Sequence, residues 1–347
     1  MIRYVVVLLE EVLIGLVADK VTLYLKGKWM RIGFIGLGNV GGKLANSILR
    51  NGFELIVRDL NTQLVNQFIE KGAKTAKTAA EVALNSDVII TCLPHPSISS
   101  EVMETDGGIL SGLSEGKIWL EMSTTDEAEV KRLGKKVIGL GAEAVDCPVS
   151  GGCHRAATGN ISIFAGCERS TFDKVLPLLS TIGRRILHTG NLGSASVLKV
   201  LTNYLATANL LTCAEALTVA KGAGMDLGTA FEAIRISSGN SFVHETESQV
   251  ILNGSRDISF TMGLVHKDIS LFQKIAEDSN VQLEINPLMI SIFKDGISRY
   301  GPNEFSPNII KRLEESTGLN IRAPGFPDEM IDDEPEERGY EVKPNLR

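Results

Sequence analysis

Residues 31–52 read RIGFIGLGNVGGKLANSILRNG, which is a short apolar run, a glycine-rich turn and an amphipathic segment. This succession predicts a β-strand, a tight turn and an α-helix. Gly36, Gly38 and Gly41 give the spacing G-x-G-x-x-G in that context. The second glycine of the pattern lets the backbone approach a pyrophosphate, and the helix that follows directs its N-terminus at the negative charge. The stretch therefore predicts a Rossmann-type dinucleotide site.

An acidic residue follows at the distance that such a site needs. The next apolar run, residues 54–58, ends in Asp59, about 20 residues beyond the turn. A carboxylate there accepts from a ribose 2′-hydroxyl and repels a 2′-phosphate, which favours NAD over NADP. Arg58 keeps NADP possible as the cofactor, although alternation along a strand directs its side chain away from Asp59. A glycine-rich turn followed by a solvated aspartate is the alternative interpretation.

Apolar runs alternate with helical segments as far as about residue 190. This order predicts βαβ units and a doubly wound parallel sheet. The expected strands are residues 54–58, 87–93, 117–121, 142–146, 160–165 and 184–188, and the expected helices include 61–71, 79–84 and 170–180.

Two polar motifs follow strands at the carboxyl edge of this sheet, where ligands bind in doubly wound folds. Ser123 and Thr124 come directly after residues 117–121, and their hydroxyls are candidates to face a nicotinamide or a substrate. The alternative is that they only cap the next helix, a role that Thr125 or Asp126 can also fill.

The second motif is the turn Ser150-Gly151-Gly152 after residues 142–146. Adjacent backbone N–H groups in such a turn can converge on a carboxylate, which makes it a candidate substrate site. A plain turn is the alternative.

Residues 190–220 predict one long helix that begins at Gly193-Ser194, where the serine oxygen can accept from the first free N–H groups. Apolar residues occur on nearly every face, so the helix is expected to be buried all round and to pass between two domains. Lys199 and Asn203 stand four residues apart and therefore share one face. One pocket can use both, whereas the alternative is a lysine whose stem follows apolar surface to reach water.

Helical segments without strands follow at residues 227–236, 244–252, 263–277, 287–300 and 307–316, and predict an all-helical second domain. Lys267 and Asp268 lie near the start of one of these helices, where a solvated ion pair is one interpretation.

The sequence divides into four parts on this basis. Residues 1–29 form an N-terminal extension without an assigned role, and our hypothesis is that the working protein starts at Met30, directly before a complete strand. Residues 30–192 form the dinucleotide-binding domain and residues 193–320 the helical domain. Residues 321–347 form an acidic, proline-containing tail that is expected to be mobile or draped on a partner.

The charge, the hydropathy and the cysteine content of the chain exclude several classes of binding partner. The 347 residues carry a formal net charge of −7 and no cluster of Lys and Arg, which argues against a nucleic-acid partner. Charged residues interrupt the apolar N-terminal segment, so a membrane span is not expected. Five cysteines without C-x-x-C spacing indicate neither a disulfide framework nor a zinc site. A small-molecule ligand, a cytoplasmic location and no metal are the expectations.

Taken together, the motifs resemble the β-hydroxyacid dehydrogenase family, which includes 3-hydroxyisobutyrate dehydrogenase, tartronate semialdehyde reductase and 6-phosphogluconate dehydrogenase. The resemblance spans about residues 31 to 316. The motifs that carry it are GFIGLGNVG, Leu93-Pro94, Ser123-Thr124, DCPVSGG at residues 146–152, the spacing of Gly193, Lys199 and Asn203, and Lys267-Asp268.

The resemblance implies hydride transfer between NAD, or possibly NADP, and a small 3-hydroxy acid, with Lys199 as the acid/base. It implies that Asn203 and the turn of Ser150, Gly151 and Gly152 hold the substrate, and we expect Asn203 and Ser150 to be catalytic residues beside Lys199. Ser123, from its place after a strand, is a further candidate for substrate binding. It also implies a homodimer or homotetramer. The implied cofactor contacts are Gly36, Leu37, Gly38, Asn39, Val40, Gly41, Asp59, Leu93, Pro94, Thr124 and Lys267.

The chain departs from the family pattern at three places. Cys147 replaces the usual alanine, Glu121 replaces an aspartate, and Thr202 stands where 6-phosphogluconate dehydrogenases carry a histidine, which disfavours that subfamily. Imine reductases share the fold but replace the lysine, so Lys199 favours alcohol chemistry. Two alternatives stay open: a reductase of tartronate semialdehyde or a related aldehyde acid, and a dinucleotide-binding sensor without turnover.

Overall fold

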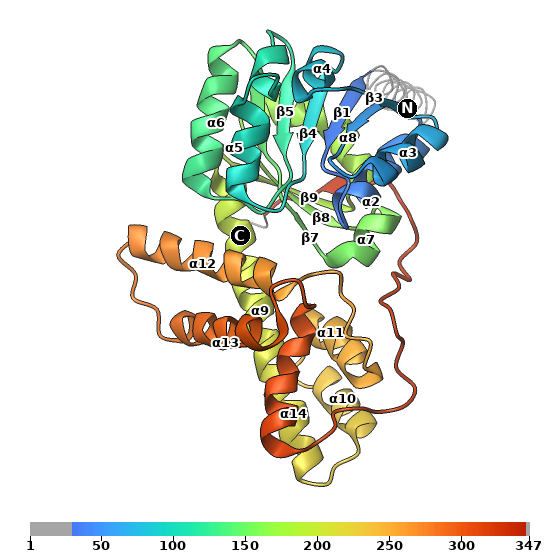
Figure 1. Ribbon diagram of the computed structural model, residues 1–347, viewed down its shortest axis with the longest axis vertical. Coiled ribbons are helices and arrows are strands. Elements are labelled where there is room, and N and C mark those ends of the chain that lie inside the picture. Colours follow the sequence, from blue (N-terminus) through green and yellow to red (C-terminus); the bar gives the residue numbers. More distant parts are fainter. Residues whose placement is uncertain (1–29, 345–347) are drawn as a thin grey trace, which may run out of the picture.

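The computed structural model describes residues 30–344 and places an α/β domain above a helical domain, with the long helix α9 between them (Figure 1). The expected fold class is confirmed. The α/β domain contains the strands β1 (Arg31–Ile35), β2 (Glu54–Arg58), β3 (Lys74–Thr75), β4 (Val88–Thr91), β5 (Ile118–Glu121), β6 (Glu143–Asp146), β7 (Val149–Ser150), β8 (Ser162–Gly166), β9 (Arg185–Gly190) and β10 (Tyr340–Glu341).

Helices cover both faces of this sheet. They are α2 (Gly41–Arg50), α3 (Thr62–Glu70), α4 (Ala79–Leu84), α5 (Pro96–Glu104), α6 (Glu127–Gly139), α7 (Gly152–Thr158) and α8 (Arg169–Ile182), with the 3-10 turn η1 (Ile109–Gly112). The helical domain contains α9 (Ser194–Gly222), α10 (Leu227–Arg235), α11 (Phe242–Asn253), α12 (Met262–Asp278), α13 (Ile285–Tyr300), η2 (Ser306–Ile310) and α14 (Lys311–Thr317).

The strand order β3-β2-β1-β4-β5-β6 is that of a Rossmann sheet, and all of these strands are parallel. The order reverses between β1 and β4, so the carboxyl ends of these two strands flank the crevice in which such sheets bind dinucleotides. Strand β4 is buried along its whole length because helices cover both faces of the sheet. Strand β8 then adds antiparallel to β6, and β9 adds parallel to β8.

The first turn of α9 is held by a carboxylate from the sheet. Gly193 precedes the helix in a left-handed conformation, and no side chain caps it. The Ser194 hydroxyl instead shares a hydrogen bond with Thr189, so the expected serine cap is wrong. Buried Asp146, at the end of β6, accepts from the Ser196 backbone N–H at 2.6 Å and from its hydroxyl at 2.7 Å. A tertiary contact therefore satisfies the helix N-terminus and fixes α9 to the sheet.

The expectation that α9 is buried all round is also wrong for a single chain. Lys199, Val200 and Leu210 are buried, but Leu205 is 58% exposed and Val219 is 70% exposed. The apolar residues do lie on several faces, but the other elements of this chain cover only part of the helix.

The acidic tail packs on its own α/β domain, which corrects the expectation of a mobile or partner-bound segment. From α14 it runs back along the outside of the molecule to the sheet (Figure 1). There β10 pairs in parallel with β9, and the Tyr340 and Val342 N–H groups donate to Arg184 and Ile186 carbonyls. Tail carboxylates pair with arginines of the α/β domain in the pairs Arg50–Glu336, Arg155–Glu334, Arg169–Glu341 and Arg184–Glu337.

Replacing Asp332 with alanine is expected to lower the free energy of unfolding by about 1–3 kcal/mol. Asp332 accepts from fully buried Asn160 at 2.7 Å and also from half-buried Thr158, so its loss removes an acceptor from both, and Asn160 keeps only the Glu334 carbonyl. Thermal denaturation measures the effect. Asp333→Ala is the matched control because Asp333 is its exposed neighbour with the same charge. Equal shifts for both variants would mean that the tail contact adds no stability.

No helix within residues 30–344 is long and apolar enough to cross a membrane. The hypothesis of a start at Met30 and the expectations for the N-terminal extension concern residues that lie outside the described part of the chain.

Candidate active site

A cavity of about 1030 Å³ opens between the two domains, at the carboxyl ends of β1 and β4. The α/β domain supplies the glycine-rich turn and the segments after β2, β4, β5 and β7, and the helical domain supplies faces of α9, α11 and α12. Of the residues predicted for the site, the lining includes Gly36, Gly38, Asn39, Val40, Gly41, Asp59, Leu93, Pro94, Ser123, Thr124, Ser150, Gly151, Gly152, Lys199, Asn203 and Lys267.

The glycine-rich turn has the shape that a pyrophosphate requires. Gly36 has φ +101°, and a Cβ there would lie 2.2 Å from the Cys92 carbonyl oxygen, so only glycine fits. Nothing lies within 4 Å of the position that a Cβ of Gly38 would take. Leu37 does not line the cavity but is buried below the turn. The turn and the N-terminus of α2 therefore leave a cradle that fits a dinucleotide.

Asp59 lies at the end of β2, as expected, and its carboxylate also holds the glycine-rich turn. It accepts from the Leu37 backbone N–H at 2.6 Å and from the Asn61 backbone N–H at 2.7 Å. Each carboxylate oxygen can accept a second bond, so a ribose hydroxyl remains compatible with these contacts. Arg58 lines the same cavity, and its guanidinium donates to the Lys77 carbonyl at 2.7 Å.

A hydrogen-bonded chain of side chains crosses from α9 to the sheet. The Lys199 Nζ donates to Asn203 Oδ1 at 2.8 Å, and Asn203 Nδ2 donates to Asp268 Oδ2 at 2.5 Å. Asp268 pairs with Lys267 at 3.0 Å, and Lys267 donates to the Thr124 carbonyl at 2.7 Å. Asp268 is 1% exposed and the Lys267 side chain 12%, so the interpretation of a solvated pair is wrong.

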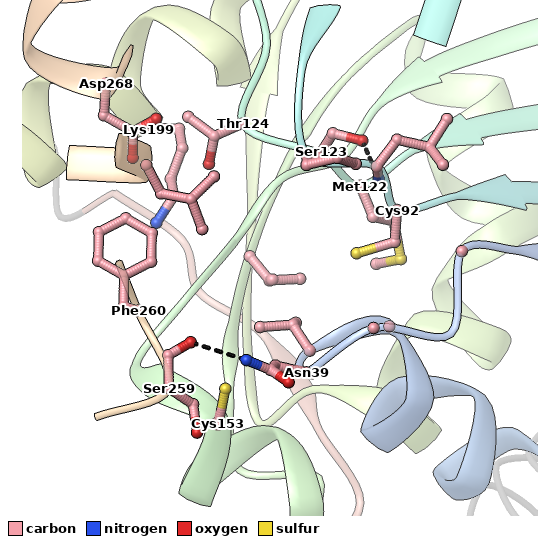
Figure 2. Close-up of a pocket in the computed structure, with 18 of the residues that line it drawn as sticks. Asn39, Cys92, Met122, Ser123, Thr124, Cys153, Lys199, Ser259, Phe260 and Asp268 are labelled. Carbon is pink, nitrogen blue, oxygen red and sulfur yellow. Dashed lines mark hydrogen bonds between the residues drawn. The ribbon is translucent and has the colours of Figure 1, made fainter. Parts of the chain in front are cut away.

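The Lys199 side chain combines burial, a place in the cavity wall and a lowered pKa. Its side chain is buried and extends into the cavity, with Asp268, Thr124 and Phe260 around it (Figure 2). Burial lowers the pKa of Lys199 to about 8, although the Asp268 carboxylate acts in the opposite direction. An amine with this pKa exists in both protonation states near neutral pH, as acid/base chemistry requires.

The hydroxyl of Ser123 is engaged within the protein. Its Oγ accepts from the Leu93 backbone N–H at 2.7 Å and donates to the buried carboxylate of Glu121 (Figure 2 shows the first of these contacts). Asp126, not Ser123 or Thr124, caps α6. Ser123 therefore fixes the position of Leu93 at the cavity wall, and Glu121, two residues earlier, holds Ser123 in turn.

The Ser150 turn leads from β7 into the short helix α7. Gly151 and Gly152 have φ values of +131° and +87°, a region that glycine alone adopts readily. Ser150, Gly151 and Gly152 all line the cavity. The turn thus borders the cavity from the side of the α/β domain.

Two thiols, Cys92 and Cys153, also line the cavity. Burial raises the pKa of Cys92 to about 12 and raises that of Cys153 as well. Neither thiol is therefore ionised near neutral pH, and thiolate catalysis is not supported.

Several lining residues were not predicted as site residues from the sequence. Arg155 lies over the ring of Phe242 at 4.8 Å, and His154 stacks on the same ring at 6.3 Å, so α7 and α11 meet at the cavity. Glu247 on α11 is another. The signal for Glu247 was present, because it interrupts an apolar stripe of a helix whose other members include Val243, Val250 and Ile251.

Comparison with protein families matches both domains. Residues 31–190 match the NAD-binding domain of 6-phosphogluconate dehydrogenase. Residues 193–313 match the domain described as the NAD-binding domain of NADP-dependent 3-hydroxyisobutyrate dehydrogenase.

Similar proteins agree with these matches. The chain is 33% identical over 295 residues to 2-(hydroxymethyl)glutarate dehydrogenase of Eubacterium barkeri, an alignment that covers 85% of this chain and 98% of the relative. It is 30% identical to the NAD-dependent L-serine dehydrogenase of Pseudomonas aeruginosa, over 83% of this chain and 98% of that one. It is also 30% identical to mitochondrial 3-hydroxyisobutyrate dehydrogenase of Rattus norvegicus, over 82% and 88% of the two chains.

Among solved structures, 3-hydroxyisobutyrate dehydrogenase from Salmonella typhimurium superposes with a TM-score of 0.75 at 24% identity, covering 82% of this chain and 99% of that one. This likeness supports the fold. Since the family matches and the similar sequences extend across both domains, the chain belongs to the β-hydroxyacid dehydrogenase family and is an NAD(P)-dependent dehydrogenase of 3-hydroxy acids.

Proposed function

We propose that this enzyme oxidises the primary alcohol of a small 3-hydroxy acid, in the manner of 3-hydroxyisobutyrate dehydrogenase, with Lys199 as the proton-transferring group. The observation that carries the proposal is the buried Lys199 amine, bonded to Asn203 and facing the same cavity as the glycine-rich turn. A buried lysine without a function would be costly. This argues against the alternative of a sensor without turnover.

The bound nicotinamide supplies the hydride acceptor. In alcohol oxidation the neutral Lys199 amine accepts the hydroxyl proton at Nζ, and in aldehyde reduction the protonated amine returns it. Asn203 holds the amine through the 2.8 Å bond and is itself fixed by Asp268. The Ser150 turn binds the carboxylate of the acid, which places its alcohol carbon between the two domains. The cavity walls exclude bulk water during the reaction.

The relatives indicate which acids to test. Their names specify 3-hydroxyisobutyrate, L-serine and 2-(hydroxymethyl)glutarate, and each of these carries a CH₂OH group beside the carbon that bears the carboxylate. Turnover of one of them, or of glycerate, with NAD or NADP at alkaline pH would support the proposal. Cofactor binding without turnover of any acid, or of the corresponding aldehydes such as tartronate semialdehyde, would contradict it.

We propose NAD as the preferred cofactor because Asp59 lines the cavity as a carboxylate. Replacing Asp59 with serine is expected to lower the ratio of kcat/KM with NAD to kcat/KM with NADP by about tenfold or more, since the repulsion of a 2′-phosphate is removed. Initial rates with each cofactor measure the ratio. Asp106→Ser, at another cavity-lining aspartate, is the control. An unchanged ratio in Asp59→Ser would mean that the Asp59 carboxylate only holds the glycine-rich turn and does not select the cofactor.

We also propose a homodimer or homotetramer. The exposed apolar face of α9, which includes Leu198, Leu201 and Leu205, supports it, because a second copy can cover residues that this chain leaves exposed.

A further inference from the structure

Helix α11 turns one face into the cavity. Phe242, Val243, Thr246 and Glu247 all line it, at the spacing of three and four residues that places side chains on one side of a helix. Glu245, on another face of the same helix, is exposed. The direction of Glu247 therefore follows from the helix itself.

One carboxylate oxygen of Glu247, Oε2, is buried without a hydrogen-bond partner among the described residues. Burial alone raises the pKa of Glu247 to about 8, with no charged neighbour contributing. The other buried acids near the cavity differ, because Asp268 and Glu121 accept hydrogen bonds from Asn203 and Ser123. A carboxylate oxygen that is shielded from water and lacks a donor is costly, and a ligand that supplies a donor removes that cost.

Helix α11 packs against α9, so Glu247 and the cavity-lining face of α9 border the same cavity. The face of α9 that carries Lys199 and Asn203 continues through Ala206 to Leu210, and all four residues line the cavity. At 1.5 Å per residue, Leu210 lies about 10 Å along the helix axis from Asn203. This length accommodates a substrate side chain of a few carbons between Asn203 and the part of the cavity that Glu247 lines, where the lining residues of α9 after Asn203 and the other lining residues of α11 carry no charge.

We propose that Glu247 binds an ammonium group at the end of the substrate side chain, so that the preferred 3-hydroxy acid has a cationic tail. This inference rests on the function proposed above. An ammonium group offers three donors and a charge opposite to that of the ionised Glu247 carboxylate, whose charged form it stabilises, and no described cation acts on this carboxylate. A carboxylate tail would meet like charge. The alternative is a substrate whose tail ends in a carboxylate and shares a proton with the neutral form of Glu247.

Three acids with the same head and different tails test the inference. They are 4-amino-2-(hydroxymethyl)butanoate, 2-(hydroxymethyl)pentanoate and 2-(hydroxymethyl)glutarate, with ammonium, methyl and carboxylate ends. The wild type is expected to have the highest kcat/KM for the ammonium tail, and Glu247→Gln to lower the ratio of ammonium to methyl tail by about tenfold or more. Glu247→Lys is expected to favour the carboxylate tail. Glu245→Gln, the same change on the exposed face of α11, should leave the ratios as they are.

Two results would overturn the inference: a wild type that prefers the methyl or carboxylate tail, or a Glu247→Gln variant that changes all three acids equally, as a structural role would. If the wild type turns over no acid, the proposed function fails instead. Calorimetric titration of the same acids into wild type and Glu247→Gln, with NAD present, then tests the inference without turnover. It measures whether the wild type binds the ammonium tail more tightly than the other two and whether Glu247→Gln loses this preference.

Discussion

Replacing Lys199 with methionine is expected to lower kcat for alcohol oxidation by about a thousandfold, within the range that a general acid/base contributes. Methionine is unbranched, apolar and of similar length, so it can fill the space of the buried side chain without offering a proton acceptor. Initial rates with the best acid of the panel measure the effect. Asn203 would also lose the donor that lies 2.8 Å from its Oδ1, but its own bond to Asp268 would still hold it.

The decisive comparison is between turnover and cofactor binding. The glycine-rich turn lies on the other domain, so NAD affinity, measured by calorimetry, is expected to stay within about threefold of the wild type in Lys199→Met. Lys221→Met, in the last turn of the same helix, controls for loss of a lysine from α9. If Lys199→Met retained a tenth or more of the turnover, the proton would have to leave through another group.

Replacing Asp268 with asparagine is expected to lower kcat/KM for oxidation by about tenfold to a hundredfold, because it leaves Lys267 buried without its counter-charge and weakens the support of Asn203. It should also change the pH profile. Oxidation requires the neutral amine, so the wild-type rate is expected to rise with pH and level off above the Lys199 pKa of about 8. The Asp268 charge raises that pKa, so its removal should move the rise to lower pH.

The pH profile separates this effect from simple damage to the fold. A destabilised protein loses activity at every pH, whereas a lower Lys199 pKa shifts the position of the rise. Asp278→Asn, at the exposed C-terminal end of α12, is the matched control. A rise that stays in place or moves to higher pH in Asp268→Asn would show that the proton acceptor is not under the influence of Asp268.

Local spacing accounts for the parts of the site that the sequence predicts. The turn around Gly38 lies between a strand and a helix that form from neighbouring residues, and Lys199 and Asn203 share a face because they are four residues apart on one helix. Such features depend on few distant contacts. The same reasoning places Asp59 at the end of β2, directly beside the turn.

The features that were wrong or missed depend on distant contacts. Asp146 takes the place of the expected serine cap from a strand 50 residues away in sequence. Asp268 is buried and Lys267 largely so because α12 packs against α9. The residues next to them in sequence do not predict this packing. Strand β10 has only two residues in an acidic segment, and its pairing partner β9 precedes it by about 150 residues, so no local hydrophobic pattern could predict it.

The returning tail has a mechanical consequence. Because β10 lies beside β9, residues 30 and 344 both belong to the α/β domain, and the entire helical domain forms an excursion between them. A pulling force applied to these two residues therefore acts first on the sheet. It reaches the helices only after β10 has separated from β9 and the arginine pairs of the tail have broken. Under load, the cavity-lining face of α11 is thus protected by the pairing of a two-residue strand with β9 in the other domain.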